Sequence, residues 1–376
     1  MIIGVDIRPM AGLRTGIQEY TDQILGHMIP MAPEHTFKLF FSSFRAPVPD
    51  RPWMHLPNVE IIRFNIPNNL LFFMGSVWGY PLVDEMIGGA DVFFSPHFFL
   101  APLSTSCRRM TTFHDLSYLR FPEFFTWRKR WWHTIEMDPA RQAKFSDTII
   151  AVSQSTKKDL IDYYHVDPAN ISVVLSGNSI ACPSSGSVAE FKKKRQLPNR
   201  FVLYLGTIEP RKNIGGLIRA FNIMKERSGF EDVELVIAGK KGWQYEDVLS
   251  EIKNSPFAPA IRALGHISDE DRSFYYAAAA VFVYPSFFEG FGSPVLEAMS
   301  CGTPVITSAN SSLPEVAAHT GLLIDPYNIS DLAEAMRIVL SDKDIQERMI
   351  SSGARRAQEF SWEHAARQTL EILMKK

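Results

Sequence analysis

Two glutamates, Glu289 and Glu297, are separated by seven residues in the sequence PSFFEGFGSPVLEAMS of 285–300. A carboxylate can accept hydrogen bonds from a pair of sugar hydroxyl groups. The glycines between the two acids allow the backbone to approach a ligand closely and to point amide N–H groups outward, which suits a diphosphate. We therefore expect one sugar ring on each side of a diphosphate. The alternative is that Glu289 is solvated and that Glu297 only stabilises a helix through its dipole.

A short helix must position the second glutamate. Ser293 followed by Pro294 predicts an N-cap and a first helical residue. The Cys-Gly-Thr-Pro sequence that begins at Cys301 predicts the end of the helix. The helix is thus expected to span about 294–301, with Glu297 one turn from its start.

A second charged motif, LYLGTIEPRKN, ends an expected strand at Gly206 and then places Arg211 and Lys212 before a helix that begins near Asn213. Two cations at a helix N-terminus repel each other and oppose the helix dipole, so an anion between them is expected. A ligand phosphate would be such an anion. Alternatively, both side chains point into water.

The sequence FHDLSYL places His114 directly after the apolar run MTTF (110–113), at the expected carboxyl end of a strand. A histidine at this position could donate a hydrogen bond to a hydroxyl group or to a developing charge. It could also be a core histidine whose hydrogen bonds are satisfied within the fold.

A glycine-containing turn, DIRPMAGLRTGIQEY, follows the first expected strand and contains Gly12 and Gly16. The residues after the turn predict a helix, because apolar side chains recur there at helical spacing. The turn lacks the Gly-x-Gly-x-x-Gly pattern of dinucleotide-binding proteins, so it identifies no ligand by itself.

Acidic residues and cysteines give little sign of a metal site. Asp269 and Asp271 form an Asp-x-Asp sequence, but acids are expected in the first turn of the helix predicted there. The cysteines are scattered and lack Cys-x-x-Cys spacing, so the sequence favours neither a zinc site nor a disulfide framework. They are Cys107, Cys182 and Cys301. We expect no metal or other cofactor and a reducing compartment.

Short apolar runs alternate with helix-period segments along the chain, which is typical of parallel sheets covered by helices on both faces. The first series of expected strands is 2–7, 37–41, 59–64, 91–94, 110–113, 147–152 and 171–175. The second series is 201–206, 233–239, 261–265, 281–285, 304–308 and 321–324. We predict an α/β protein with two Rossmann-like, doubly wound domains that face each other across a ligand-binding cleft.

Composition suggests where these domains end. The expected N-terminal domain spans 1–180, and the Pro-, Ser- and Lys-containing stretch of 181–199 predicts a linker with a solvated helix. The C-terminal domain is expected to span 200–360. The segment 361–376 predicts an amphipathic helix, opened by Ser361 as N-cap, that packs back on the N-terminal domain.

Charge and hydropathy exclude two classes of protein. The formal net charge of −2 and a pI near 6.6 provide no overall positive field for a polyanion, so nucleic acid is not an expected partner. The longest mostly apolar stretch, 69–83, contains Gly and Pro and is shorter than the about 20 residues that span a bilayer. An integral membrane protein is therefore not expected.

The motifs together resemble the retaining glycosyltransferases of family 4, which have the GT-B fold. The resemblance covers nearly the whole chain, and its most specific element is the glutamate pair with Arg-Lys upstream. The other motifs that carry it are GLRTGI, HDL, AVSQST, AGKKGW, GHISDED and FSWEHAARQTLEI. The resemblance implies transfer of a sugar from a nucleotide diphosphate donor, with retention at the anomeric carbon and without a metal ion.

The resemblance also implies how the donor phosphates are held. Arg211 and Lys212 would bind the diphosphate and stabilise the charge that grows on it as the sugar leaves. Gly16 would leave room beside the phosphates. The loop before the helix would contribute backbone amides to the same anion, from Gly290, Phe291, Gly292 and Ser293.

The remaining implied contacts are to the sugar, the ribose and the base. Glu289 would hold sugar hydroxyl groups, Glu297 the ribose, and the backbone near His266 and Ile267 the base. His114 would contact the donor sugar near the reacting centre, so it joins Glu289 and the two cations as an expected catalytic residue. Because no carboxylate is placed as a covalent nucleophile, we expect same-face attack by the acceptor.

Within the family, the chain most resembles bacterial mannosyltransferases that use GDP-mannose in O-antigen or exopolysaccharide assembly. The acceptor would then be a glycan on undecaprenyl diphosphate. The stretch FFTWRKRWWHT (124–134) mixes tryptophans with basic residues, which suits an anionic membrane surface, although its aromatic residues could also belong to the core or to an acceptor cleft. We expect a cytoplasmic protein, peripheral on the inner face of the cytoplasmic membrane.

Several alternatives stay open at this point. The donor could be a UDP- or dTDP-sugar that carries rhamnose, glucose or N-acetylglucosamine. A GT-B phosphorylase or a sugar nucleotide epimerase would be a different enzyme on the same fold. A non-catalytic GT-B protein that binds a glycan or scaffolds an assembly is the alternative from another class.

Overall fold

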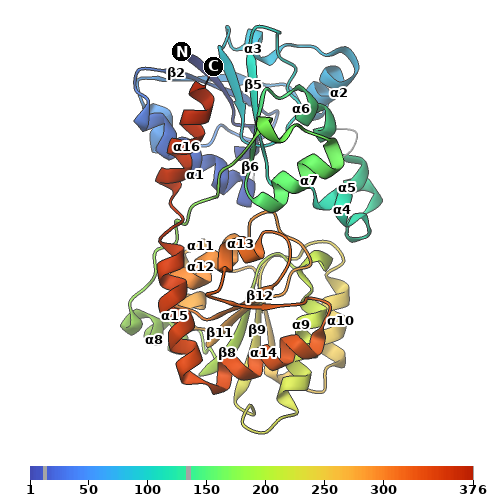
Figure 1. The fold of residues 1–376 in the computed structure, drawn as a ribbon, viewed down its shortest axis with the longest axis vertical. Coiled ribbons are helices and arrows are strands. Elements are labelled where there is room, and N and C mark those ends of the chain that lie inside the picture. The colour runs from blue at the N-terminus through green and yellow to red at the C-terminus, as the bar shows by residue number, and fades with distance from the viewer. Residues whose placement is uncertain (12–14, 133–136, 376) are drawn as a thin grey trace. The chain divides into compact units, whose positions relative to one another are not determined.

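The computed structural model describes residues 1–11, 15–132 and 137–375, so Gly12 and the last two residues of the 124–134 stretch lie outside the described residues. The chain divides into two compact units, of which one comprises Met1–Gly177 with Ser361–Lys376 and the other comprises Asn178–Phe360. Each unit contains one sheet with helices on both faces (Figure 1). The predicted class of two Rossmann-like α/β domains is confirmed.

The sheet of the first unit has the strand order β3-β2-β1-β4-β5-β6-β7, and neighbouring strands are parallel. Side chains on both faces of the central strands are buried, as in Val5 and Phe94, which explains why these strands read as continuous apolar runs. The strands are β1 (Ile2–Asp6), β2 (Thr36–Ser42), β3 (Val59–Phe64), β4 (Val92–Ser95), β5 (Arg108–Phe113), β6 (Thr148–Ala151) and β7 (Ile171–Val173).

Helices cover both faces of this sheet. The α-helices are α1 (Gly16–Met31), α2 (Asn68–Trp78), α3 (Val83–Met86), α4 (Ser117–Arg120), α5 (Trp127–Trp131), α6 (Pro139–Phe145), α7 (Gln154–Tyr164) and α16 (Trp362–Met374). The 3-10 helices are η1 (Arg8–Met10), η2 (Pro52–His55), η3 (Pro122–Phe124) and η5 (Pro168–Asn170).

The sheet of the second unit has the order β10-β9-β8-β11-β12-β13, again with parallel neighbours. Its strands are β8 (Arg200–Leu205), β9 (Val233–Ala238), β10 (Ile261–Gly265), β11 (Val281–Tyr284), β12 (Val305–Ser308) and β13 (Leu322–Ile324). Every apolar run that predicted a strand overlaps one of these strands or one in the first sheet, with ends that agree within two residues.

The helices of the second unit alternate with its strands. They are α8 (Ser185–Lys194), η6 (Pro210–Lys212), α9 (Ile214–Lys225), α10 (Glu246–Asn254), η7 (Ala258–Ala260), α11 (Asp269–Ala278), α12 (Ser293–Ser300), α13 (Leu313–Ala317), α14 (Ile329–Ser341) and α15 (Lys343–Ala357). The helix α8 lies in the stretch that predicted a linker and packs on α11, where Phe191 stacks on Phe274 with 4.8 Å between ring centroids.

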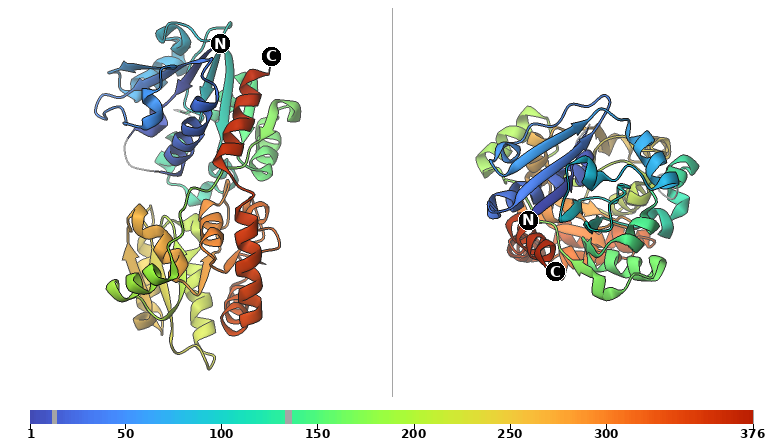
Figure 2. Two further views of the ribbon diagram at one scale, coloured as in Figure 1. Left: turned by 90° about the vertical axis from the view of Figure 1, so that its left-hand side faces the viewer. Right: turned by 90° about the horizontal axis from the view of Figure 1, so that it is seen from above.

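The last helix, α16, belongs to the first unit and packs against α1, as both views in Figure 2 show. Its N-cap is Ser361, whose side chain accepts a hydrogen bond from the backbone N–H of His364. The ring of Trp362 contacts Tyr20 of α1 at a centroid distance of 5.9 Å. The side chains of Ala365, Ala366 and Leu373 are buried, so α16 completes the covering of α1.

Two cysteines that are far apart in sequence meet at the end of α12. The Sγ atoms of Cys182 and Cys301 are 2.9 Å apart, and the Cys182 thiol also donates to the carbonyl of Ser300 at 3.0 Å. Both are free thiols. Sequence spacing gave no sign of this pair, because the two cysteines are distant in sequence and meet only through the tertiary fold of the second unit.

Candidate active site

The second sheet brings the two charged motifs together. Its strand order reverses between β8 and β11, which are neighbours although the strands β9 and β10 lie between them in sequence. Arg211 and Lys212 follow the carboxyl end of β8, and Glu289 follows the carboxyl end of β11. Ligands of doubly wound sheets bind at such a switch point, outside the carboxyl ends of the strands.

At this switch point, the Glu289 carboxylate binds both cations. Lys212 Nζ donates to Glu289 Oε1 at 2.6 Å, and Arg211 Nη1 donates to Glu289 Oε2 at 3.2 Å. Arg211 also donates to Glu209 Oε1 through Nη2 at 2.9 Å, and Lys212 donates to the hydroxyl of Tyr284 at 2.9 Å. The alternative that both side chains point into water is therefore wrong. A carboxylate of the same chain provides the expected anion.

Burial and charge act in opposite directions on Glu289. Desolvation of its buried carboxyl group would raise the pKa, but the nearby charges of Lys212 and Arg211 outweigh this effect and hold the pKa below its ordinary value. The neighbouring Tyr284 has a pKa raised well above its ordinary value, first by burial and then by the charge of Glu289. Glu289 is therefore ionised and Tyr284 is neutral at pH 7.

Hydrogen bonds to its backbone fix the loop that carries Glu289. The backbone N–H of Glu289 donates to Ser311 Oγ at 3.1 Å, and Ser312 Oγ donates to the carbonyls of Glu289 and Phe291 at 2.9 and 2.8 Å. Arg211 Nη1 also donates to the carbonyl of Phe288 at 3.0 Å. The loop is thus held by Ser311 and Ser312, which directly precede α13, and by the cation Arg211.

The start of α12 differs from the prediction by one residue. Gly292 is the N-cap, with φ of 104° and ψ of 40°, and Ser293 is the first helical residue without a side-chain cap. Only glycine adopts this left-handed backbone without strain, so a glycine replaces the predicted serine cap. Pro294 has no N–H, and the N–H of Val295 donates to the Gly292 carbonyl at 3.0 Å. The N–H groups at the start of α12 that have no acceptor within the helix are therefore those of Gly292 and Ser293, which suits a bound anion.

Glu297 lies within α12 and forms a second polar cluster. The hydroxyl of Tyr276 donates to Glu297 Oε2 at 2.9 Å, and Arg272 Nη1 lies 3.4 Å from Glu297 Oε1. The carboxylate is largely buried. Tyr276 and Arg272 both come from α11, so this helix sets the orientation of Glu297.

Glycines bring the ends of β8 and β9 close together beside the cations. Gly239 follows β9 with φ of 151°, and a Cβ atom there would lie 1.7 Å from the carbonyl oxygen of Gly206. The backbone N–H of Gly239 donates to the carbonyl of Gly265 at 2.7 Å. His266 and Ile267 follow Gly265 in the loop between β10 and α11, at the same carboxyl edge of the sheet.

In the first unit, His114 directly follows β5 as predicted. Its Nε2 lies 2.8 Å from the carbonyl of Pro96, which can only accept, so Nε2 carries the hydrogen. The ring packs edge-on against Tyr20 at 4.8 Å. Burial lowers the pKa of His114, although the Pro96 carbonyl and the Asp115 charge act in the opposite direction. His114 is therefore neutral at pH 7, with Nδ1 as an acceptor.

Gly16 is the first residue of α1, after the N-cap Thr15, and it lies one turn before Tyr20. A Cβ atom at Gly16 would meet no atom within 4 Å. Packing within the unit therefore does not explain a glycine at this position.

Several residues of the site were not singled out from the sequence. Glu209 and Tyr284 bind the two cations, Ser311 and Ser312 hold the loop, and Tyr276 holds Glu297. Glu209 is two residues before Arg211, so its position in a charged motif could have suggested it. The tyrosines belong to apolar segments and gave no such signal.

Two other features bear on where a ligand can bind. Among residues 1–11, 15–132 and 137–375, no group of three or more His, Cys, Asp or Glu side chains could hold a metal ion. Asp269 and Asp271 lie in the first turn of α11, where Ser268 is the N-cap. No helix in the described part of the chain is both long enough and apolar enough to cross a bilayer.

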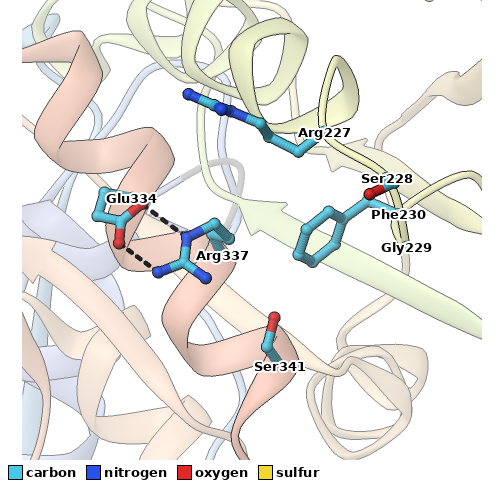
Figure 3. Close-up of a pocket in the computed structure, with 7 residues that line it drawn as sticks. All are labelled: Arg227, Ser228, Gly229, Phe230, Glu334, Arg337 and Ser341. Carbon is cyan, nitrogen blue, oxygen red and sulfur yellow. Dashed lines mark hydrogen bonds and ion pairs between the residues drawn. The ribbon is translucent and has the colours of Figure 1, made fainter.

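A pocket between the ends of α9 and α14 lies away from the charged motifs. It is lined by Arg227, Phe230 and neighbouring residues, as well as by Glu334 and Arg337, which pair with each other (Figure 3). Phe230 precedes β9 and Ser341 ends α14, so the pocket is at the amino ends of the strands. This edge is opposite to the one that carries Glu289.

Comparison with known proteins identifies the family. Residues 16–178 match the model "Glycosyltransferase Family 4", and residues 187–356 match "Glycosyl transferases group 1". The O-antigen chain mannosyltransferase B of Escherichia coli is 34% identical over 284 residues, which cover 74% of this chain and 73% of that protein.

Solved structures show the same fold at low sequence identity. Sucrose-phosphate synthase from Thermosynechococcus elongatus superimposes with a TM-score of 0.76 over 99% of this chain and 98% of that one, at 22% identity. HepE from Anabaena, in complex with UDP-glucose, gives a TM-score of 0.73 over 99% of both chains, at 20% identity. The fold is GT-B. With both halves of the chain matched and a relative above 30% identity, the protein belongs to the group 1, family 4 glycosyltransferases.

Proposed function

We propose that this protein is a retaining α-mannosyltransferase that transfers mannose from GDP-mannose to a lipid-linked glycan during O-antigen assembly. The observation that carries the proposal is the cluster of Arg211, Lys212 and Glu289 at the switch point of the second sheet. This cluster has two cations at the position where a doubly wound fold binds phosphates. A non-catalytic scaffold would have no need of such buried charges.

Charge development on the leaving group explains what the cations do. As the bond from the sugar to the diphosphate breaks, negative charge grows on the diphosphate oxygens. Arg211, Lys212 and the N–H groups of Gly292 and Ser293 stabilise that charge more than the charge of the ground state. Metal ions are not needed for this step, so the proposal includes catalysis in their absence.

The state of Glu289 favours one route to retention. Its carboxylate is bound by two cations and has a lowered pKa, which makes it a weak nucleophile. A covalent glycosyl intermediate on Glu289 is therefore disfavoured. The acceptor hydroxyl attacks from the same face as the departing diphosphate, and a diphosphate oxygen takes its proton.

The other site residues have roles in binding. Glu289 and its loop face the sugar hydroxyl groups, Glu297 accepts from the ribose hydroxyls, and the backbone of 266–267 meets the base. The neutral ring of His114 offers Nδ1 as an acceptor for a donor sugar hydroxyl, rather than the donor N–H that was expected. Gly16 leaves space for the phosphates.

The similarity to the E. coli O-antigen chain mannosyltransferase supports the choice of mannose and of an O-antigen acceptor. An acceptor carried on undecaprenyl diphosphate would bring the reaction to a membrane surface. The exposed residues Trp127 and Trp131 of the basic stretch 124–134 fit that setting.

Thermal stabilisation by nucleotides tests the donor assignment. Purified protein is heated with GDP, GDP-mannose, UDP, UDP-glucose or a dTDP-sugar, each with and without a chelator. A ligand at 100 times its Kd adds about 2.7 kcal/mol, well above experimental scatter. We expect GDP and GDP-mannose to stabilise the protein, with no effect of the chelator.

Variants make the test specific to the site. Arg211→Ala, Lys212→Ala and Glu297→Ala should lose the stabilisation. Arg219→Ala should keep it, because Arg219 pairs with Glu251 on the outer side of α9. Stabilisation by UDP compounds alone would replace GDP-mannose with a UDP-sugar as the donor. If no nucleotide stabilises the wild type, the transferase activity itself is in question.

A further inference from the structure

The helix α2 (Asn68–Trp78) is mostly apolar and contains no charged residue, its polar side chains being those of Asn68, Asn69 and Ser76. Its inner side, Leu71, Phe72 and Gly75, is buried in the first unit. Its outer side carries large apolar residues that are exposed to solvent: Leu70, Phe73, Val77 and Trp78. These residues are spaced by three, four and one, so they form one continuous stripe along the helix.

This stripe differs from the single apolar residues that are scattered over most protein surfaces. Phe73 is 57% exposed and Trp78 is 66% exposed, and their rings contact each other edge-on at 5.9 Å. Tyr80, directly after the helix, is 58% exposed. Exposed apolar patches of this kind mark contact surfaces.

Cations of α6 lie beside the C-terminal end of the stripe. Arg141 of α6 donates to the carbonyl of Ser76 at 3.0 Å, and its guanidinium lies over the ring of Phe145 at 5.9 Å. Phe145 is itself exposed and follows the exposed Lys144. The segment 139–145 thus adds two cations and one aromatic side chain beside the C-terminal end of α2.

The basic helix α5 lies on the same flank. Phe125 and Trp132, at its two ends, pack against the core cluster that also contains Phe72 of α2. Figure 1 shows α2, α5 and α6 along one side of the first unit. Exposed Trp127 and Trp131 are interleaved with Arg128, Lys129 and Arg130.

Charge complementarity identifies the surface that this flank fits. The segments 68–80, 124–131 and 139–145 contain Arg128, Lys129, Arg130, Arg141 and Lys144 but no acidic residue, although the chain as a whole has a net charge of −2. Apolar and aromatic side chains flanked by cations bind the interface of an anionic bilayer. At 11 residues, α2 is too short to span a bilayer and suits a position parallel to its surface.

We propose that α2, together with α5 and α6, forms a membrane-binding surface that inserts Phe73, Val77 and Trp78 into the headgroup region of an anionic bilayer. The inference deepens the proposed function, because it rests on an acceptor that is carried by a lipid. It adds the apolar side of α2 and the cations of α6 to the basic stretch 124–134.

Vesicle binding tests the proposal. Full-chain protein is sedimented with vesicles of phosphatidylcholine alone or with added phosphatidylglycerol. The wild type should bind the anionic vesicles, and binding should weaken with added salt. F73S/W78S should bind about tenfold or more weakly, because two inserted aromatic side chains are lost. R128Q/K144Q should lose the preference for phosphatidylglycerol.

Control variants show whether vesicle binding depends on α2 in particular. L249N and I350N remove exposed apolar residues of α10 and α15 in the second unit, and they should bind vesicles as the wild type does. Stabilisation by the nucleotide donor, measured without lipid, should be unchanged in F73S/W78S. If the nucleotide donor stabilises the protein but the wild type fails to bind vesicles, the proposal of a membrane-binding surface is wrong. The donor assignment is then unaffected.

A second outcome would also overturn the proposal. The stripe could instead cover a second copy of the chain. In that case light scattering would show a wild-type dimer that F73S/W78S converts to a monomer, and vesicle binding would not change with the same substitutions.

Discussion

The carboxylate of Glu289 is the counter-charge that Arg211 and Lys212 share. Without it, Arg211 and Lys212 would be two neighbouring buried cations that lack the negative charge they now share. In the proposed function, phosphate oxygens of the donor would bind the cations that Glu289 now binds, and the glutamate oxygens would become available for sugar hydroxyl groups. Binding of the donor would then exchange one anion for another.

Replacing this carboxylate should be costly. Glu289→Gln removes the charge that both cations share, so the free energy of unfolding should fall by about 3–5 kcal/mol. Urea unfolding at pH 7 measures the change. Glu334→Gln is the control, because Glu334 pairs with Arg337 in an exposed, solvent-screened position, and its loss should change the free energy of unfolding far less.

The same substitution should change how stability depends on pH. The pKa of Glu289 is lowered in the folded protein, so its ion pairs stabilise the fold fully above the ordinary glutamate value of about 4.3 and are lost as the pH falls through the folded pKa. Between about pH 5 and 3, stability should fall less steeply in Glu289→Gln than in the wild type. Equal slopes would mean that Glu289 is not the titrating group.

Gly16 offers a test of function that does not disturb folding. Because a Cβ atom there meets no atom within 4 Å, Gly16→Ala should unfold at the wild-type temperature or slightly above it. Its KM for the donor should nonetheless rise, since the methyl group occupies the space assigned to phosphates. Gly186→Ala on α8 has the same open surroundings and should leave the KM unchanged. An unchanged KM in Gly16→Ala would remove Gly16 from the site.

At the scale of single residues, the sequence predicted the charged residues of the site but not the residues that they contact. Arg211, Lys212 and Glu289 were predicted as site residues from local motifs, since glycine loops and helix starts are local signals. Their direct contact was missed, because it depends on β8 and β11 being neighbours in the sheet. The buried partner Tyr284, which ends β11, was missed for the same reason. Glu209 was missed although it is only two residues before Arg211.

At the scale of elements, the close approach of β8 and β9 depends on Gly239. Gly239→Ala should lower the free energy of unfolding by several kcal/mol, because the new Cβ would overlap the Gly206 carbonyl as well as strain the backbone. Gly229→Ala is the control, because Gly229 also has a positive φ, of 93°, but no neighbouring atom within 4 Å of an added Cβ. Gly239→Ala should therefore lose more stability than Gly229→Ala, and equal losses would mean that the overlap costs little.

The pair of cysteines at the end of α12 should be accessible to oxidation. A diazene oxidant should accept two electrons and two protons from Cys182 and Cys301 and leave a disulfide, seen as a loss of two hydrogens by mass spectrometry. Cys107 is buried, and burial raises its pKa to about 12, so it should stay reduced. Cys182→Ser should abolish the product, and a disulfide that includes Cys107 would contradict the geometry.

Element types followed from the sequence more reliably than element ends. Continuous apolar runs indicated every strand in the two sheets of the described residues, because strands buried on both faces need them. The cap of α12 was placed one residue late, since Ser-Pro is a strong start signal and the backbone conformation of Gly292 cannot be inferred from its neighbours. The helix α8 was expected to be solvated, yet Phe191 anchors it to α11.

At the scale of the whole molecule, the packing of α16 on α1 should contribute to the stability of the first unit. Trp362→Ala should lower its free energy of unfolding by about 3–5 kcal/mol, because Trp362 is buried against Tyr20. Hydrogen exchange should show faster exchange in α1 and unchanged exchange in β8 and β11. Trp78→Ala, which removes an exposed tryptophan, should change stability by less than about 0.5 kcal/mol. Faster exchange throughout both units would mean that they unfold together.

The first unit combines Met1–Gly177 with Ser361–Lys376, so it cannot complete its fold until the second of these segments has been synthesised. The ribosome releases β1 to β7 first, but the side of α1 that α16 covers stays open until the segment 362–374 has emerged. The second unit, Asn178–Phe360, is complete before that segment is made. The half that begins first therefore matures last, and its exposed α1 surface is the natural place for a chaperone to act while the rest of the chain is translated.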